Sequence, residues 1–166
     1  MSIVWRDKVL SSYNGNIESV VVHDGAGEKE VPNGVFVTLD GLIKGKGREV
    51  KKAVLATDPT ADVLLVSTPE VLYEAGKEID DFVNEKGHVA RAFRLADGDV
   101  ISMTEDLLNT APTGEGREVF VVGTGGKLAP IGETAEADVA VKFVVREDAG
   151  RELHRTKQAW RFDVVK

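Results

Sequence analysis

Glycine-rich turns are the first places in this chain where residue types could do chemistry. Residues 123–126 (Gly-Thr-Gly-Gly) follow an apolar run, as the phosphate-binding turn of a dinucleotide site does. The third glycine of that pattern falls on Leu128, and Pro130 stands where the helix facing the pyrophosphate should begin. We therefore expect a hairpin turn at this position and no bound nucleotide.

A second glycine-rich stretch, residues 41–47, is similar to a phosphate loop. It has one residue too few before Gly-Lys, and Gly47 stands where a serine or threonine would bind magnesium. We interpret it as a mobile, locally basic surface loop over 41–49. Asp97 and Asp99 flank a glycine, but a calcium loop needs further oxygen ligands and a distal glutamate at fixed spacing. Turn chemistry explains this pair better.

The remaining candidates for catalysis or metal binding lack the required spacing. The three histidines, His23, His88 and His154, are far apart in sequence, and none belongs to a paired metal motif. The chain has no cysteine and no nucleophile elbow, so thiol catalysis and disulfides are excluded. The sequence thus predicts no catalytic residue, no cofactor and no metal, which favours an interaction or structural protein over an enzyme.

Charge and hydropathy narrow the class of partner. Among 166 residues, 21 basic and 28 acidic side chains give a net charge of 21 − 28 = −7. Without a dense basic cluster, such a chain is a poor ligand for nucleic acid or for anionic membranes. No apolar run approaches the roughly 20 residues of a membrane span, and the N-terminus lacks the order of a signal peptide. We expect synthesis in the cytoplasm.

The most legible elements lie between residues 62 and 104. A short apolar run at 63–66 predicts a buried strand. Apolar residues spaced by three and four, with Thr68 as a cap and Pro69 in the first turn, predict a main helix near residues 69–86. Gly87 would end that helix. Alternation then predicts a strand at 89–95, and the turn at 96–99 leads into the next strand at 100–104.

The rest of the chain reads as short strands between turns, at 17–22, 35–39, 50–57, 118–122, 137–145 and 159–165. We interpret residues 146–157 as a charged loop between paired strands. The fold class predicted is mainly β (α+β): a compact β-barrel or sandwich of short antiparallel strands with one main helix. We expect an N-terminal arm at 1–16 and a β-rich domain at 17–166, with a possible sub-boundary at the turn 58–61.

The N-terminal arm contains Ile3, Val4 and Trp5. These residues could add a strand to a sheet edge, Trp5 could pack on its own domain, or the three could dock on a partner, since a tryptophan anchor is common at interfaces. We take Ile3, Val4 and Trp5 as the candidate partner-binding residues. Deleting residues 2–8 should then leave the fold intact and abolish partner binding.

One passage is similar to a known class of proteins. It consists of four segments: Thr68-Pro69-Glu70-Val71-Leu72-Tyr73-Glu74, Asp81-Phe82-Val83-Asn84-Glu85-Lys86-Gly87, Ala90-Arg91-Ala92-Phe93-Arg94-Leu95 and Gly98-Asp99-Val100-Ile101-Ser102-Met103-Thr104. Together with the upstream residues 33–41, this passage resembles tailed-bacteriophage capsid decoration (cement) proteins or head-fibre-type proteins. The resemblance covers about residues 30–105.

The resemblance implies a structural, non-enzymatic virion protein made in the host cytoplasm. Copies, often as trimers, would bind the major capsid protein on the outer surface of the head and stabilise the expanded shell. The acidic balance suits a surface that must not bind the packaged DNA. Two alternatives stay open: another virion component, such as a head–tail joining or tail protein, and a small ligand-binding β-barrel or enzyme with an unrecognised pocket.

Overall fold

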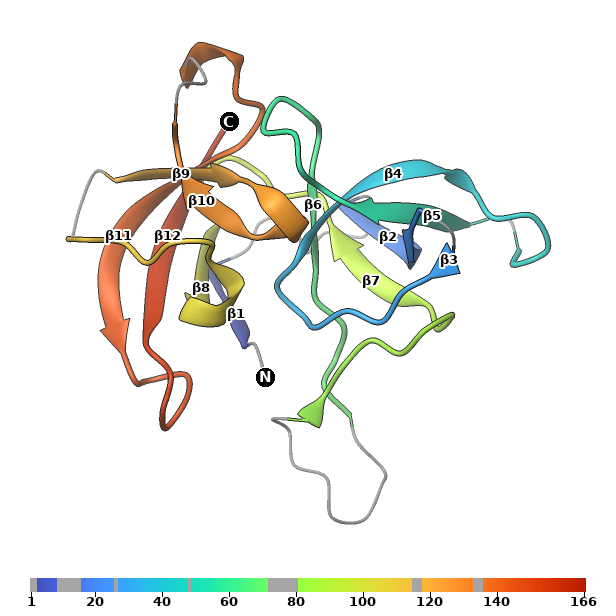
Figure 1. Cartoon of the computed structure of the whole chain (residues 1–166), viewed down its shortest axis with the longest axis horizontal. Coiled ribbons are helices and arrows are strands. Elements are labelled where there is room, and N and C mark those ends of the chain that lie inside the picture. The colour runs from blue at the N-terminus through green and yellow to red at the C-terminus, as the bar shows by residue number, and fades with distance from the viewer. Residues whose placement is uncertain are drawn as a thin grey trace.

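The chain folds into two β-sheets that share one core (Figure 1). The computed structural model describes residues 3–8, 16–25, 27–47, 49–71, 81–114, 118–132 and 136–166, with the backbone alone for residues 5–8. The strands are β1 (Val4–Lys8), β2 (Ile17–Asp24), β3 (Gly27–Glu28), β4 (Phe36–Leu42), β5 (Val50–Leu55), β6 (Leu64–Val66), β7 (Ala90–Phe93), β8 (Val100–Thr104), β9 (Val119–Val122), β10 (Leu128–Pro130), β11 (Lys142–Gly150) and β12 (Ala159–Val165).

The first sheet closes into a five-stranded barrel. Its strands follow the order β2-β5-β4-β6-β7, and β7 returns to pair with β2, while β3 extends β2 at its end. The β2–β5 pair is parallel and the other pairs are antiparallel. Residues 58–61, where the sequence suggested a sub-boundary, connect β5 to β6 within this barrel.

Buried valine, alanine and leucine side chains share one face of all five barrel strands. Cross-strand partners place eight such residues on the same face, because side chains alternate along a strand. They form the pairs Val20–Ala90, Val22–Ala53, Val37–Leu64 and Val66–Ala92. None of the eight is more than 3% exposed. Eight-stranded barrels are already filled by side chains, so this narrower barrel is a packed core.

The second sheet has the order β1-β8-β12-β11-β9-β10, with every pair antiparallel. A 3₁₀ turn, η4 (Glu105–Leu107), follows β8 and brings Leu108 into a bridge with Leu128 of β10. The sheet therefore curls, since the segment after β8 returns to the strand at its far edge. In Figure 1 this sheet lies to the left of the barrel.

Aromatic rings and glycines join the two sheets. Phe36 of β4 packs on Phe143 of β11 with ring centroids 4.9 Å apart. Gly126, in the 3₁₀ turn η5 (Thr124–Gly126), donates its N–H to the carbonyl oxygen of Ala56 at 2.9 Å. Leu107 packs where a side chain on Gly34 would otherwise lie. The two sheets consequently bury one continuous cluster of apolar residues.

The mainly β prediction is confirmed, but the main helix near residues 69–86 is wrong. Residues 69–71 and 82–86 are not helical, and residues 72–80 lie outside the described part of the chain. The described helical structure is limited to short 3₁₀ turns, among them η6 (Glu136–Asp138). The cause is tertiary: Asn84 exchanges both backbone hydrogen bonds with Val31, at 2.8 and 3.1 Å, which fixes this part of the chain in a β-bridge instead of a helix.

Several strand predictions are confirmed, and β8 and β12 have the predicted bounds. The interpretation of residues 146–157 as a loop is wrong for its first part, because β11 continues to Gly150. Two register shifts in β11, after Val145 and after Asp148, admit extra residues without breaking the pairing with β12. The charged residues 146–148 therefore lie within a paired strand and not in a loop.

Candidate functional site

The N-terminal arm forms the edge strand of the second sheet. Strand β1 pairs with β8 in the register Val4–Met103, Trp5–Ser102 and Lys8–Val100, with a bulge between Trp5 and Lys8. Strand β1 stands at one end of this sheet, and within the described part of the chain β8 is the strand that pairs with it. Its outer edge carries the N–H and C=O groups through which sheets add further strands.

Two of the three predicted partner-binding side chains lie inside the protein. Ile3 is 6% exposed and packs in a small cluster with Ala149, Leu153 and Ala159. Val4 is 7% exposed and belongs to the main core. Burying an aliphatic side chain of this size stabilises a fold by about 1.5–3 kcal/mol. The side chain of Trp5 lies outside the described part, so partner binding by this arm stays a prediction.

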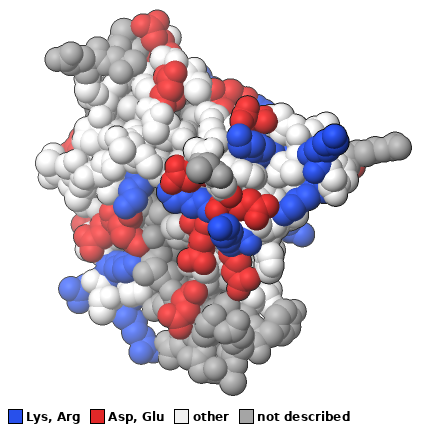
Figure 2. All heavy atoms as spheres, turned by 45° about the vertical axis from the view of Figure 1, so that its right-hand side comes forward, with Lys and Arg blue, Asp and Glu red and all other residues white. Residues whose placement is uncertain are grey.

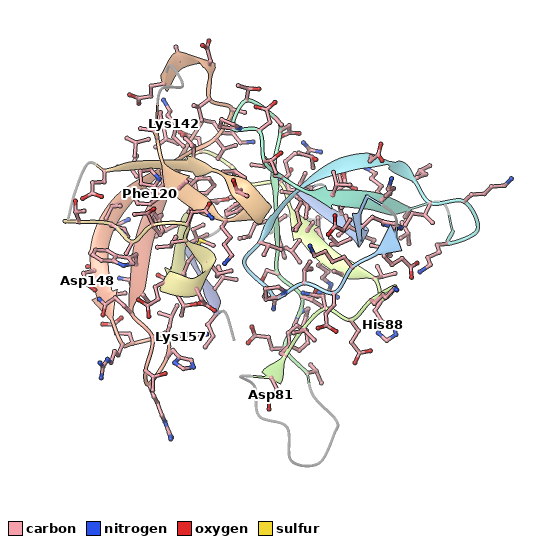
Figure 3. The ribbon with its side chains drawn as sticks, in the orientation of Figure 1. Asp81, His88, Phe120, Lys142, Asp148 and Lys157 are labelled. Carbon is pink, nitrogen blue, oxygen red and sulfur yellow. The ribbon has the colours of Figure 1, made fainter. Side chains whose placement is uncertain are left out.

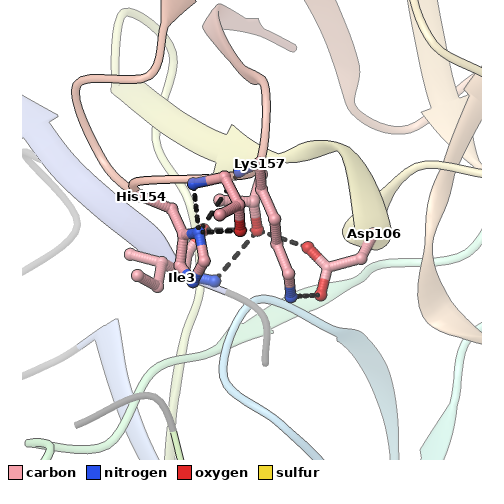
Figure 4. Close-up of polar contacts among 6 residues, drawn as sticks. Ile3, Asp106, His154 and Lys157 are labelled. Atoms are coloured by element: carbon pink, nitrogen blue, oxygen red, sulfur yellow. Dashed lines mark hydrogen bonds and ion pairs between the residues drawn. The ribbon is translucent and has the colours of Figure 1, made fainter.

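Figure 4 shows Ile3 close to Asp106, Lys157 and His154, and Thr104 holds this start of the arm in place. The N–H of Ile3 donates to Thr104 Oγ1 at 3.0 Å, and the N–H of Thr104 donates back to the carbonyl oxygen of Ile3 at 3.1 Å. The Thr104 hydroxyl donates to Asp106 Oδ1, and Lys157 Nζ donates to Asp106 Oδ2 at 2.8 Å. These residues, which we call the anchor cluster (Ile3, Thr104, Asp106, Lys157 and His154), join three distant parts of the chain.

His154 orients the loop that carries Lys157. Its Nδ1 accepts the backbone N–H groups of Thr156 at 3.1 Å and of Lys157 at 3.2 Å. An imidazole nitrogen that accepts N–H bonds carries no proton, so this geometry is that of the tautomer protonated at Nε2. His154 thereby closes a turn that directs Lys157 towards Asp106.

A second polar network is buried at one end of the barrel. Asn33, 2% exposed, donates from Nδ2 to the carbonyl oxygen of Thr68 at 2.8 Å and to Glu70 Oε1 at 3.2 Å. Asn33 Oδ1 accepts from the N–H of Thr68 at 2.9 Å and from Asn84 Nδ2 at 3.0 Å. One side chain thus ties together residues 68–70 and residue 84.

Sequence reasoning missed both networks. The helix expected near residues 69–86 includes Asn84, and no catalytic or binding motif contains Asn33, Asp106 or Lys157. The bonds of the anchor cluster join residues 101 and 51 positions apart, and no local spacing reports such contacts.

The glycine-rich stretches have structural roles. Residues 123–126 form the predicted hairpin turn between β9 and β10, and Gly126 packs against the barrel. In the loop at 41–47, Lys46 Nζ contacts Glu28 Oε1 at 3.1 Å and the carbonyl oxygen of Gly87 at 2.7 Å. In the described part of the chain, no α-helix begins after either glycine-rich stretch, as one does at a phosphate-binding loop.

The candidate titratable groups are dispersed. Figure 3 places His88 and Asp81 on the barrel side and Asp148 and Lys157 on the second sheet. Within the described residues, no group of three or more histidine, aspartate or glutamate side chains could hold a metal ion. Asp99 lies in the turn predicted for it, where its Oδ2 accepts the N–H of Ala96 at 2.8 Å.

One face of the molecule carries charges of both signs. Figure 2 shows one face on which basic and acidic side chains are interspersed. Several form ion pairs between neighbouring strands, such as Lys51 with Glu18 and Lys52 with Asp40, both at 2.8 Å. Exposed pairs of this kind contribute little to stability, about 0–1 kcal/mol each. On this face the basic residues do not gather into a single-sign patch.

No helix in the described part of the chain is long and apolar enough to cross a membrane. Comparisons with known proteins find no matching family model, no matching curated protein and no matching solved structure.

Proposed function

We propose that this protein is a bacteriophage capsid decoration protein, a non-enzymatic component that binds the major capsid protein on the outer surface of the head. The observation that carries the proposal is the resemblance of residues 30–105 to decoration and head-fibre-type proteins. In the fold, that stretch contains β4 to β8, and so spans most of the barrel and the step into the second sheet.

The architecture supports an interaction role. The barrel is filled by its own small side chains, which disfavours a ligand-binding barrel. The two sheets form a body with one core, and β1 provides a strand edge of the kind that main-chain pairing uses. A net charge of −7 disfavours binding to the packaged DNA.

The mechanism is bridging between capsid subunits. Each copy, or each trimer of copies, contacts more than one subunit of the lattice. Several weak contacts act together, because the first contact raises the effective concentration for the next. Binding then requires the spacing that the capsid subunits have in the expanded head. Once bound, each bridging copy opposes movement of those subunits away from one another.

The test is co-sedimentation of the purified protein with expanded heads that lack decoration, quantified as copies per head. Binding at hundreds of copies supports the proposal. A low, fixed copy number with ring formation supports a head–tail joining protein instead. No binding, together with a monomer in solution, contradicts the proposal and leads to a thermal-shift screen for ligands.

The contribution of the arm is tested in the same assay with Trp5→Ala. The matched control is Leu42→Ser, because Leu42 is 62% exposed on the barrel, far along the chain from the arm. If the arm contacts the lattice, Trp5→Ala lowers the copies per head and Leu42→Ser does not. Equal binding of both variants would show that Trp5 is not a contact.

A further inference from the structure

Strand β1 comes from the start of the chain, but its binding site is made by the second half. Its backbone pairs with β8, and Ile3 packs on Ala149, Leu153 and Ala159. The next strand, β2, belongs to the barrel and pairs with no strand of the second sheet. The arm therefore reaches its site as a separate segment.

The site that receives β1 has contacts of its own that do not involve β1. Thr104 is fully buried, and its hydroxyl bonds to Asp106. Asp106 is held by Lys157, and the N–H of Lys157 is held by His154. These bonds connect the end of β8 to the loop before β12, so Thr104 is also held by residues outside the arm.

We infer that the edge of β8 and the Ile3 pocket together form an acceptor site for an N-terminal strand, and that a second copy of this chain can supply that strand. Every contact made by β1 within one chain is available, unchanged, between two chains, and this is why exchange of an identical element is a low-cost route to association. The inference does not depend on binding to a capsid.

Protein concentration decides whether β1 pairs with β8 of its own chain or with β8 of a second copy. A tethered strand has an effective concentration in the millimolar range at its own site, so exchange between copies should become frequent only as the protein concentration approaches about 1 mM. Copies crowded side by side reach such concentrations locally, whereas dilute copies keep their own strand.

The chain lacks cysteine, so cross-links can be introduced without background. Val4 and Met103 are direct partners in the β1–β8 ladder, and the Cα separation of such partners suits a disulfide. Val4→Cys and Met103→Cys are made as separate full-length variants, mixed, and oxidised with oxidised glutathione. The double variant, which carries both cysteines in one chain, reports pairing of β1 with its own β8. Each single variant, oxidised alone, measures random cross-linking between chains.

The expected result is a disulfide-linked dimer in the mixture that exceeds both single-variant controls and increases at least severalfold as the protein concentration is raised. A mixture with no dimer above the controls, while the double variant cross-links within the monomer, would overturn the inference. The pair Lys8→Cys and Val100→Cys repeats the test should Met103→Cys fail to fold. Absence of any cross-link in both double variants would also overturn it, because β1 would then not occupy β8.

Discussion

The N–H of Gly126 and the carbonyl oxygen of Ala56 lie 2.9 Å apart and form a hydrogen bond between the hairpin β9–β10 and the end of barrel strand β5. At this point the hairpin backbone contacts the barrel directly. Gly126 has φ of 69°, and a Cβ there would overlap the carbonyl oxygen of Phe36 and lie 3.2 Å from the Phe36 nitrogen. A glycine is thus required both by conformation and by close approach.

Gly126→Ala should destabilise the protein by about 3 kcal/mol, combining the cost of a left-handed alanine with overlap against backbone atoms that cannot move aside. The matched control is Gly125→Ala, because Gly125 has φ of 72° and open space where its Cβ would lie. The control should lose only about 1 kcal/mol. Urea unfolding of both variants measures the difference, and equal losses would show that the close approach does not matter.

Asn33→Ala should destabilise the protein by about 1–3 kcal/mol, because it removes the acceptor of the half-buried Thr68 N–H and one of the two acceptors of the buried Asn84 amide, which keeps the carbonyl oxygen of Val31. The control, Asn109→Ala, removes an exposed amide that donates to Thr124 at 3.3 Å, and it should change stability by less than about 0.5 kcal/mol. Thermal and urea unfolding provide the comparison. A loss for Asn33→Ala no larger than for the control would contradict the network described here.

Strands were predictable where alternation is local. The bounds of β12 follow from its own alternating residues, and those of β8, all five of which are buried, follow from a short run after a turn. The helix prediction failed because apolar spacing at three and four residues does not report a distant pairing partner: Phe82 is buried two residues before Asn84, which forms a β-bridge with Val31. Tertiary pairing overrode the helical pattern.

The candidate site was only partly predictable. The apolar character of Ile3 and Val4 suggested a strand edge or a docking segment, and the structure shows that they form a strand edge. Their receptor could not be predicted, because Thr104 lies 101 residues from Ile3 and the pocket comes from residues 149–159.

Thr104→Val should loosen the N-terminal strand selectively. The substitution keeps the shape of the side chain but removes the acceptor for the Ile3 N–H and the donor for Asp106, at a cost of about 2 kcal/mol. Hydrogen exchange should therefore accelerate in residues 3–8 more than in the barrel strands. Thr104→Ser retains the hydroxyl and should restore most of the protection. Equal exchange in the wild type and in Thr104→Val would show that the hydroxyl does not hold the arm.

Stability should fall in acid, in part through Asp58. Its Oδ1 accepts the hydroxyl of Thr60 at 2.7 Å and the N–H of Thr60 at 2.9 Å, and these hydrogen bonds, the hydroxyl first, hold the pKa of Asp58 below its ordinary value of 3.8. Thr113 lowers the pKa of Glu118 below 4.5 in the same way. A carboxyl whose pKa is lower in the folded state binds fewer protons there than in the unfolded state. Its contribution is therefore fully present above the ordinary pKa and is lost as the pH falls through the lowered one.

Asp58→Asn tests this argument. The urea midpoint of the wild type should exceed that of the variant at pH 6, and the difference should shrink as the pH falls below about 4, because the wild-type carboxyl is then protonated as well. Thr60→Val, which removes the first of the two donors, should show the same pH dependence with a smaller amplitude, since the backbone donor of Thr60 remains. A difference between wild type and Asp58→Asn that stays constant from pH 6 to pH 3 would mean that the charge on Asp58 makes no contribution to folding.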